Sequence, residues 1–415
     1  MGIADAQDSL LASRLADFVE NECIPAEEVF NKQLDQLEKQ HGSRWVEVPQ
    51  VMSDLKRRAQ EQSLWNLFMP SGYPGSQDIP MEEYAKLSEI MGRSFLAPEA
   101  CNCGAPDTGN MEVLAKYGTP EQQQRWLTPL LQGTIRSAFL MTEPDVASSD
   151  ATNISCSIRR QGGNYVINGR KWWSSGAMDP RCKVLIVMGR MDESERSPRH
   201  QQHSIVVVPA DAVGVQMVRP LTVFGYDDAP HGHAEVLLTD VKVPCSSIIL
   251  GEGRGFEIAQ GRLGPGRVHH CMRAIGMAER ALSLLMKRSL RRKTFGKLLA
   301  DHDGVRDLVS KSRIAIDQAR LLVLDCAAKL ERDGLQRAIQ AVSMIKVAVP
   351  TAVCQVLDRA IQVHGGAGVS SDTFLAKAYA HMRTLRIADG PDEVHLRAIA
   401  KQEYKKASQH SLSRL

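Results

Sequence analysis

The sequence lacks the features of several large protein classes. No apolar run approaches the roughly 20 residues of a membrane-spanning helix, and a formal net charge of +3 is too small to indicate a nucleic-acid or membrane partner. The nine cysteines are scattered; Cys101 and Cys103 lie close together, but without a second cluster they form no zinc-site pattern. We therefore expect no metal site, and reduced thiols in an intracellular compartment.

The two ends of the chain differ in what they indicate about location. The N-terminal residues carry early acids and no basic segment, which argues against a signal peptide or a typical transit peptide. The last three residues, Ser413, Arg414 and Leu415, are a close variant of the Ser-Lys-Leu tripeptide that peroxisomal import receptors read. The expectation is a peroxisomal matrix protein if the source is eukaryotic, and a cytoplasmic protein if it is bacterial.

The residue patterns change twice along the 415 residues, which exceed the usual span of one hydrophobic core. Residues 1–137 repeat apolar positions at helical spacing. Residues 138–252 hold short segments rich in β-branched residues, separated by Gly, Pro and Asn, which predict a β-sandwich or β-barrel. Residues 253–415 return to long amphipathic segments, with apolar residues three and four positions apart from Ile275 to Leu285. The sequence thus predicts an α+β protein whose three domains have these boundaries.

Four motifs each have a functional and a purely structural interpretation. Met141–Asp150 and Lys171–Gly176 (KWWSSG) could bond and cover a flat heterocycle, or be a polar connection and a pair of core tryptophans. Arg291–Lys297 (RRKTFGK) sets a guanidinium beside an aromatic ring, which suits a pyrophosphate near an adenine, although its basic residues also fit a solvated helix face. Gln362–Gly368 (QVHGGAG) would let backbone amides approach phosphates, or simply end a helix. Each motif alone is weak evidence.

A fifth motif, Arg386–His395 (RIADGPDEVH), contains three carboxylates within five positions. Asp392 and Glu393 fall in the first turn of a predicted helix, where acids interact favourably with the helix dipole. Asp389 differs because it precedes the Gly-Pro break, on the loop side, where a carboxylate can project into a cleft. Asp389 is therefore the candidate catalytic residue.

In this order and spacing, the five motifs resemble the acyl-CoA dehydrogenase family over essentially the whole chain. The strings WNLFMP, GRLGPGRVHHCMR and ADGPDEVH are most similar to the dehydrogenase module of members 10 and 11 of that family. The resemblance implies an N-terminal helical domain, a middle β-barrel or sandwich and a C-terminal four-helix bundle. It also implies FAD-dependent conversion of a fatty acyl-CoA, including long-chain, 4-hydroxy or 4-phospho acyl-CoA, to the trans-2-enoyl-CoA.

The resemblance also implies roles for individual residues. Asp389 would be the base that removes the α-proton of the thioester. Trp173 would shield one face of the flavin ring and Ser175 would bond the ring. The residues implied to line the flavin or the neighbouring CoA are Met141, Thr142 and Ser149. Those implied to hold the pyrophosphate and adenine of a neighbouring subunit's FAD are Arg292, Phe295, Gln362, Gly365 and Gly366. Those implied to contact the substrate are Ser149, Arg267 and Gly390.

The implied partners are an acyl-CoA substrate, a second or further copies of the chain in a homodimer or homotetramer that shares FAD sites, and an electron acceptor. The family's usual acceptor is electron-transferring flavoprotein, and a peroxisomal address would leave other acceptors open, oxygen included. For a 4-phosphorylated substrate, the basic GRVHHCMR string suggests a phosphate contact from His269, His270 or Arg273.

The sequence departs from the family pattern at three places. Asp389 stands where glutamate is usual, Pro391 replaces a usual threonine, and Gly264–Arg267 lacks an acid that often contacts the pantetheine. Some relatives carry their base on that same helix, but Gly266 offers no competing carboxylate there. Nitroalkane oxidases resemble the family and also use an aspartate base, so they remain an alternative. A non-catalytic DNA-binding flavoprotein is a second alternative, disfavoured by the small net charge.

Overall fold

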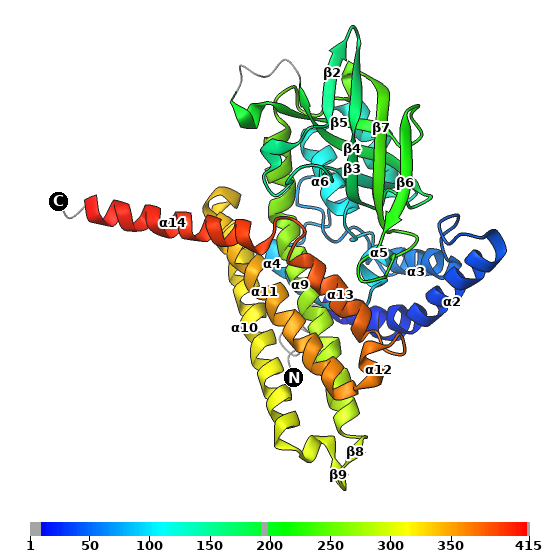
Figure 1. Cartoon of the computed structure of the whole chain (residues 1–415), viewed down its shortest axis with the longest axis vertical. Coiled ribbons are helices and arrows are strands. Elements are labelled where there is room, and N and C mark those ends of the chain that lie inside the picture. Colours follow the sequence, from blue (N-terminus) through cyan, green and yellow to red (C-terminus); the bar gives the residue numbers. More distant parts are fainter. Residues whose placement is uncertain (1–9, 192–197, 413–415) are drawn as a thin grey trace. The chain divides into compact units, whose positions relative to one another are not determined.

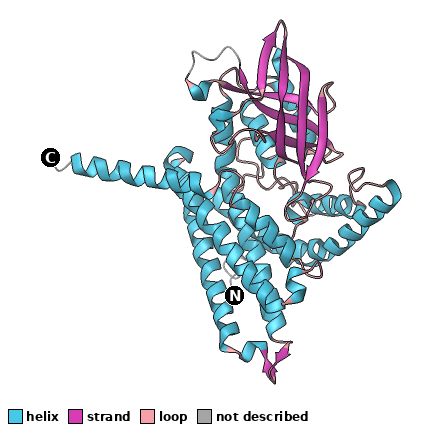
Figure 2. Ribbon diagram, viewed as in Figure 1, coloured by secondary structure: helices cyan, strands magenta, loops and turns pink. Residues whose placement is uncertain are grey.

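The computed structural model describes residues 10–191 and 198–412 (Figures 1 and 2). These residues divide into two compact units. Of the described residues, 10–24, 80–97 and 264–412 form the helical unit, and 25–79, 98–191 and 198–263 form the sheet unit. The two units cut across the three predicted sequence domains, because the N-terminal residues contribute to both. The Ser413–Leu415 tripeptide lies outside the described residues, so the location expected from it stays a prediction.

The helical unit consists mainly of helices. They are α1 (Leu10–Phe18), α4 (Met81–Met91), most of α9 (Gly255–Ser289), α10 (Asp303–Asp333), α11 (Leu335–His364), α13 (Leu375–Leu385) and α14 (Asp392–Leu412). Shorter elements are the π-turn Val19–Cys23, the strands β8 (Lys293–Thr294) and β9 (Lys297–Leu298), the 3-10 turn Leu299–Asp301 and α12 (Gly366–Val369). Helix α11 packs against α10, α13 and α14, and α9 shares their apolar core. The spacing predicted from Ile275 to Leu285 is confirmed, since these apolar side chains of α9 are buried in that core.

Helix α11 continues through Pro350. Among the described residues it is also the helix whose length and composition would allow it to cross a membrane. Its apolar side chains, including Val342, Val349 and Leu357, are buried against the neighbouring helices of the unit. A buried core helix passes the same test of length and composition, so this property is weak evidence for a membrane span.

The sheet unit combines helices with one β-sheet. The helices and turns are α2 (Ile24–His41), α3 (Gln50–Glu61), α5 (Ala97–Ala100), α6 (Asp107–Tyr117), α7 (Pro120–Gln122), the π-turn Gln123–Leu127, α8 (Thr128–Leu131), and the 3-10 turns Ala151–Asn153, Arg199–Gln201 and Cys245–Ser247. The strands are β1 (Arg136–Leu140), β2 (Ser157–Gln161), β3 (Asn164–Ser175), β4 (Cys182–Met191), β5 (His203–Pro209), β6 (Val215–Leu221) and β7 (His233–Pro244). Helix α7 begins with a capping box, in which the side chains of Thr119 and Gln122 each bond the other residue's backbone N–H.

The seven strands form a mixed sheet with the order β1-β4-β2-β3-β7-β6, and β5 also pairs with β4. Strands β1 and β2 both run parallel to β4. Strand β5 pairs with residues of β4 that also pair with β1 and β2, so β5 lies along the opposite edge of β4. Strands β2, β3, β7 and β6 are antiparallel neighbours (Figure 2). The β segments predicted between residues 138 and 252 are therefore confirmed as strands of a single sheet.

Candidate functional site

The candidate base lies in the loop between α13 and α14 of the helical unit. Helix α13 ends at Leu385, and the loop turns through Asp389 (φ 56°) and Gly390 (φ 98°) before α14 begins. Aspartate and glycine tolerate this left-handed backbone better than most residues. A Cβ on residue 390 would also lie 3.0 Å from the Nε2 of His395. The Gly-Pro break that singled out Asp389 in the sequence therefore produces a tight turn with the aspartate at its apex.

Three side chains bind the backbone of this loop. The Nζ of Lys346 on α11 donates to the carbonyls of Leu385 (2.6 Å) and Ala388 (2.8 Å). The guanidinium of Arg267 on α9 donates to the Asp389 carbonyl over 3.1 and 3.3 Å, and the Nε2 of His395 lies 3.3 Å from the same oxygen. Lys346 and Arg267 are buried. Burial lowers the pKa of both cations, while Asp389 acts in the opposite direction. These bonds fix the backbone position of Asp389 without using its carboxylate.

The carboxylate of Asp389 has a different neighbour, His270 on α9, whose Nε2 lies 3.6 Å from Oδ2. Both side chains keep 25% of their surface exposed. The Nδ1 of His270 lies 3.3 Å from a guanidinium nitrogen of Arg273. A carboxylate that is anchored through its backbone and still accessible is suited to accept a proton from a ligand.

The adjacent His269 lies elsewhere. Its ring is buried and packs edge-on against Tyr84 at 4.6 Å between centroids. Burial, with Arg273 and His270 adding to it, lowers the pKa of His269 well below its usual value. Of the two histidines proposed from the sequence for a phosphate contact, only His270 therefore lies beside Asp389.

We expect His395→Gln to reduce the loss of stability at acid pH. Burial, with Arg267 adding to it, lowers the pKa of His395 from 6.5 to about 4, so between these values the unfolded chain binds a proton that the folded chain does not. The stability contributed by this residue therefore falls as the pH drops through this window, by at most about 3 kcal/mol. Glutamine can still donate to the Asp389 carbonyl but does not titrate.

The measurement is the melting temperature of both proteins at about pH 7 and about pH 5. The variant should lose less than the wild type, and His200→Gln, at an exposed position, should follow the wild type. Equal pH dependence in all three proteins would contradict the argument.

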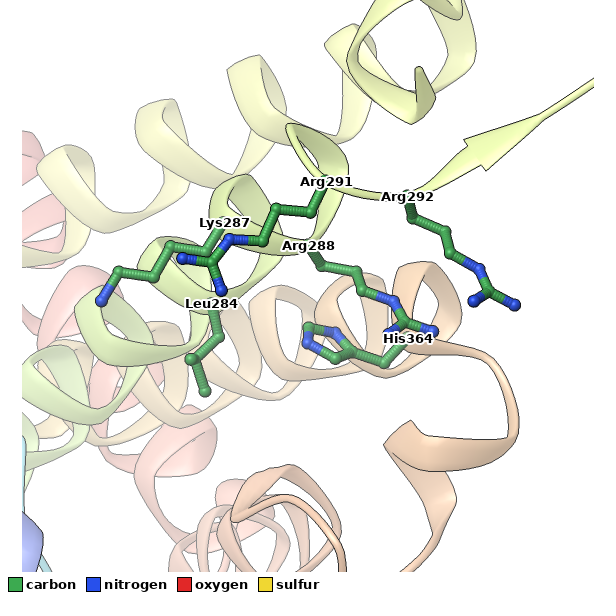
Figure 3. A pocket seen from close by; sticks show the side chains of 6 residues that line it. All are labelled: Leu284, Lys287, Arg288, Arg291, Arg292 and His364. Atoms are coloured by element: carbon green, nitrogen blue, oxygen red, sulfur yellow. The ribbon is translucent and has the colours of Figure 1, made fainter. Parts of the chain in front are cut away.

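A cationic pocket lies at the other end of the helical unit. It has a volume of about 400 Å³ and is lined by Leu284, Lys287, Arg288, Arg291, Arg292 and His364 (Figure 3). The first five come from the end of α9 and the turn after it, and His364 is the last residue of α11. Within the described part of the chain, the buried Nε of Arg288 has no hydrogen-bond partner. A buried guanidinium N–H without a partner, surrounded by further cations, fits a phosphate or pyrophosphate group.

The glycine-rich and hairpin motifs adjoin this pocket. Gly365 (φ 62°) ends α11 directly after the pocket residue His364, and a Cβ on Gly365 or Gly366 would meet nothing within 4 Å. Gln362, one turn earlier, is exposed. Phe295 sits with Gly296 at the tip of the β8–β9 hairpin and is 96% exposed. The sequence left open whether the basic run is a solvated helix face. In the structure, Lys287, Arg288, Arg291 and Arg292 of this run form one wall of the cationic pocket.

In the sheet unit, the buried Lys171 connects the first two motifs. Its Nζ donates to the carbonyls of Met141 (2.9 Å) and Met188 (2.7 Å) and pairs with Glu143 at 2.8 Å. Next to it, the Trp172 amide donates to the Thr142 carbonyl over 3.0 Å. These bonds join the end of β1 to β3. The structure therefore brings Met141 and Thr142 beside the tryptophan pair, whereas Ser149 lies in the exposed turn that follows.

Strand β3 presents Trp173 on an irregular stretch. Its pairing with β7 shifts between Lys171 and Ser174, and Trp173 (φ 50°) remains 38% exposed. An indole held out of a strand by backbone distortion is free to cover a flat ligand. The neighbouring Ser175 lies 2.9 Å, Oγ to Nδ1, from His233, which the sequence did not single out. The pairing of β3 with β7 places His233 opposite Ser175. Knowledge of this strand register would have identified His233 as a neighbour of the site.

Three family models match almost the whole chain. They describe the N-terminal, middle and C-terminal domains of acyl-CoA dehydrogenases and match residues 5–134, 138–241 and 253–404. The chain belongs to the acyl-CoA dehydrogenase family. The predicted likeness to members 10 and 11 is confirmed, since both are among its relatives at about half identity.

Individual acyl-CoA dehydrogenases give the extent of the similarity. The chain is 53% identical over 422 residues to "Probable acyl-CoA dehydrogenase IBR3" of Arabidopsis thaliana, covering 96% of this chain and 50% of the relative. It is 51% identical over 413 residues to family member 11 of Rattus norvegicus, covering 96% and 52%. The chain thus spans about half the length of these relatives. "Probable acyl-CoA dehydrogenase FadE2" of Mycobacterium tuberculosis is 51% identical and is covered over 94% of both chains.

Solved structures of acyl-CoA dehydrogenases support the fold. A structure described as a candidate acyl-CoA dehydrogenase from Mycobacterium abscessus has a TM-score of 0.92 at 48% identity, covering 97% of this chain and 99% of that one. Butyryl-CoA dehydrogenase from Megasphaera elsdenii has a TM-score of 0.76 at 21% identity, covering 95% and 98%. The second comparison shows a common fold alone.

Proposed function

We propose that this acyl-CoA dehydrogenase is FAD-dependent and converts a fatty acyl-CoA to the trans-2-enoyl-CoA, with Asp389 as the base. The observation that carries the proposal is the loop of Asp389. Lys346, Arg267 and His395 bind backbone carbonyls of this loop, while the carboxylate keeps a quarter of its surface exposed. A base needs this combination of fixed position and access to its proton donor.

The chemistry explains why one carboxylate is insufficient. The α-proton of a thioester is too weakly acidic for a free carboxylate to remove rapidly, so hydrogen bonds must stabilise the charge that develops on the thioester oxygen. We propose the backbone N–H of Asp389 or Gly390 as one such donor. Bound FAD would supply the acceptor for the hydride that leaves the β-carbon.

We propose that FAD is held by two sets of residues, those that contact the flavin ring and those that contact the pyrophosphate and adenine. Trp173 would cover the flavin ring, Ser175 would bond it, and the residues that line it would be Met141, Thr142 and Ser149. The cationic pocket of Arg288 and Arg292 fits the pyrophosphate, as its unpartnered guanidinium N–H indicates. The residues proposed with Arg292 for the pyrophosphate and adenine of a neighbouring subunit's FAD are Phe295, Gln362, Gly365 and Gly366.

The proposal implies an oligomer. Exposed apolar side chains on the helical unit support a further copy of the chain as partner, a homodimer or homotetramer. They include Leu290, Phe295, Ile314, Leu321, Val369 and Tyr404. The electron acceptor is proposed to be electron-transferring flavoprotein or another oxidant.

The test is anaerobic mixing of the FAD-loaded protein with a panel of acyl-CoA thioesters while flavin absorbance is followed. Rapid bleaching by a thioester, with the enoyl-CoA recovered, is the expected result. Bleaching by nitroalkanes but by no thioester would replace the proposal with a nitroalkane oxidase, which also uses an aspartate base. Salt-dependent retention on DNA without bleaching by either class would indicate the non-catalytic alternative.

Within the acyl-CoA class, we propose a long-chain or 4-substituted substrate, including the 4-phosphorylated thioester. Support comes from His270, which lies 3.6 Å from the carboxylate of Asp389, and from Arg273, whose guanidinium lies 3.3 Å from His270. A phosphate on the acyl chain would need such basic side chains. A His270→Gln/Arg273→Gln protein should lose kcat/KM for 4-phosphorylated thioesters about tenfold more than for the plain chain. Equal losses for both substrates would remove this part of the proposal.

A further inference from the structure

The strongest unassigned feature of the sheet unit is the imidazole of His233, which lies against both residues proposed to hold the flavin ring. Ser175 on β3 and His233 on β7 are directly opposite in the antiparallel ladder. The serine Oγ and the histidine Nδ1 are 2.9 Å apart, a normal hydrogen-bond distance. The same imidazole contacts the ring of Trp173, with 5.4 Å between centroids and 57° between planes. His233 therefore supports the indole and the hydroxyl together.

The protonation of this imidazole decides what Ser175 can offer to a ligand. A hydroxyl has a single proton to donate and two lone pairs to accept with. If Nδ1 carries a hydrogen, it donates to the serine oxygen and leaves the serine proton available to a ligand. If Nδ1 carries no hydrogen, it accepts a hydrogen bond from the serine O–H. Ser175 can then only accept a hydrogen bond from a ligand. An imidazolium always carries a hydrogen on Nδ1, so protonation of His233 makes Ser175 a donor.

The surroundings of His233 include groups that bias this choice. The Oδ2 of Asp228, in the segment before β7, lies 3.9 Å from Nε2 and favours the imidazolium. The ring of His231, in the same segment, is 6.4 Å away. Burial, together with Arg136 and His233, lowers the pKa of His231 to about 4, so His231 is neutral near neutral pH. Leu221 of β6 pairs with His233, and β3 contributes Trp173 and Ser175.

We propose that His233 sets, through the Ser175 hydroxyl, the hydrogen bond that the protein offers to the flavin ring, and thereby makes the reduction potential of the flavin depend on the protonation of this imidazole. The inference rests on the proposed function only in placing FAD at Trp173 and Ser175. His233 is a positioning residue, because it acts through Ser175. A hydrogen bond donated to a ring atom that gains electron density and remains an acceptor stabilises the reduced flavin, and loss of that bond makes reduction less favourable.

The test measures the midpoint potential of the FAD-loaded protein against pH, with a chemical reductant and indicator dyes and no acyl-CoA. Across the titration of His233, the wild type should show an extra change of about tenfold in the reduction equilibrium, which is about 30 mV for a two-electron couple. His233→Gln, which does not titrate, should abolish this increment. His200→Gln, at an exposed position of the same unit, should leave it unchanged.

A double-variant cycle separates this role from a structural one. In a Ser175→Ala protein the hydroxyl is absent, so adding His233→Gln should produce no further shift in potential. Nitrogen NMR of the protein without FAD should show the Nδ1 of His233 changing its protonation over the same pH range. Additive shifts in the cycle, or a wild-type potential without the increment, would overturn the inference. Because no thioester is used, this failure is distinct from an absence of bleaching by acyl-CoA, which would instead overturn the proposed function.

Discussion

Asp389→Asn should lower the rate of flavin reduction by acyl-CoA about 10²–10⁴-fold, the usual cost of removing a general base. The variant should fold normally for a structural reason. Arg267 and His395 bind the backbone carbonyl of Asp389, and asparagine keeps that carbonyl. Asparagine also tolerates the positive φ of this position. The loss should therefore appear in the chemical step, while FAD content and melting temperature stay near those of the wild type.

Two further variants make the result specific. Asp389→Glu restores the carboxylate with one more methylene and should recover part of the rate. Asp372→Asn removes a carboxylate from an exposed position of the same unit and should have wild-type kinetics. Stopped-flow absorbance of the flavin under anaerobic conditions gives the rates. Wild-type bleaching by Asp389→Asn would show that another group removes the proton.

Lys171→Met should destabilise the protein by about 3–5 kcal/mol, the cost of leaving one member of a buried ion pair without its partner. Lys171 is fully buried and makes three bonds of 2.7 to 2.9 Å, one of them to Glu143. Glu143 is buried as well and also accepts bonds from Ser155 and Cys156. Although burial acts to raise it, Lys171 and Ser155 hold the pKa of Glu143 below its usual value. Methionine removes the largest of these lowering effects, so Glu143 is left either as an unpaired buried charge or as a carboxyl that must take up a proton, and both outcomes reduce stability.

The measurement is the melting temperature or the denaturant midpoint, together with FAD content, because the lost bonds also position Met141. A Lys171→Met/Glu143→Gln protein should be more stable than Lys171→Met alone, since it removes the unpaired charge. Lys183→Met, on the exposed face of β4, should change stability by less than about 0.5 kcal/mol. A double variant as unstable as the single one would assign the loss to the two carbonyl bonds.

The local patterns of the sequence determined the elements and their order. Short segments rich in β-branched residues, set off by Gly, Pro and Asn, predicted β3, β4, β5 and β7, and spacing of three and four residues predicted the buried face of α9. The Gly-Pro break after Asp389 separated this carboxylate from Asp392, which the structure pairs with Arg386 at 2.8 Å. Five motifs in the family's order were sufficient to predict the family, because each motif reflects a local requirement on the backbone or the side chains.

The tertiary structure alone decided which distant residues meet. His233 reaches Ser175 through the register of two strands, and Lys346 and Arg267 reach the loop of Asp389 from two different helices. Neither contact produces a repeating pattern of residues in the sequence. Each contact depends on strand register or helix packing between segments far apart in the chain. For the same reason the adjacent His269 and His270 looked equivalent in the sequence. The orientation of α9 about its axis buries His269 against Tyr84 and places His270 beside the carboxylate of Asp389.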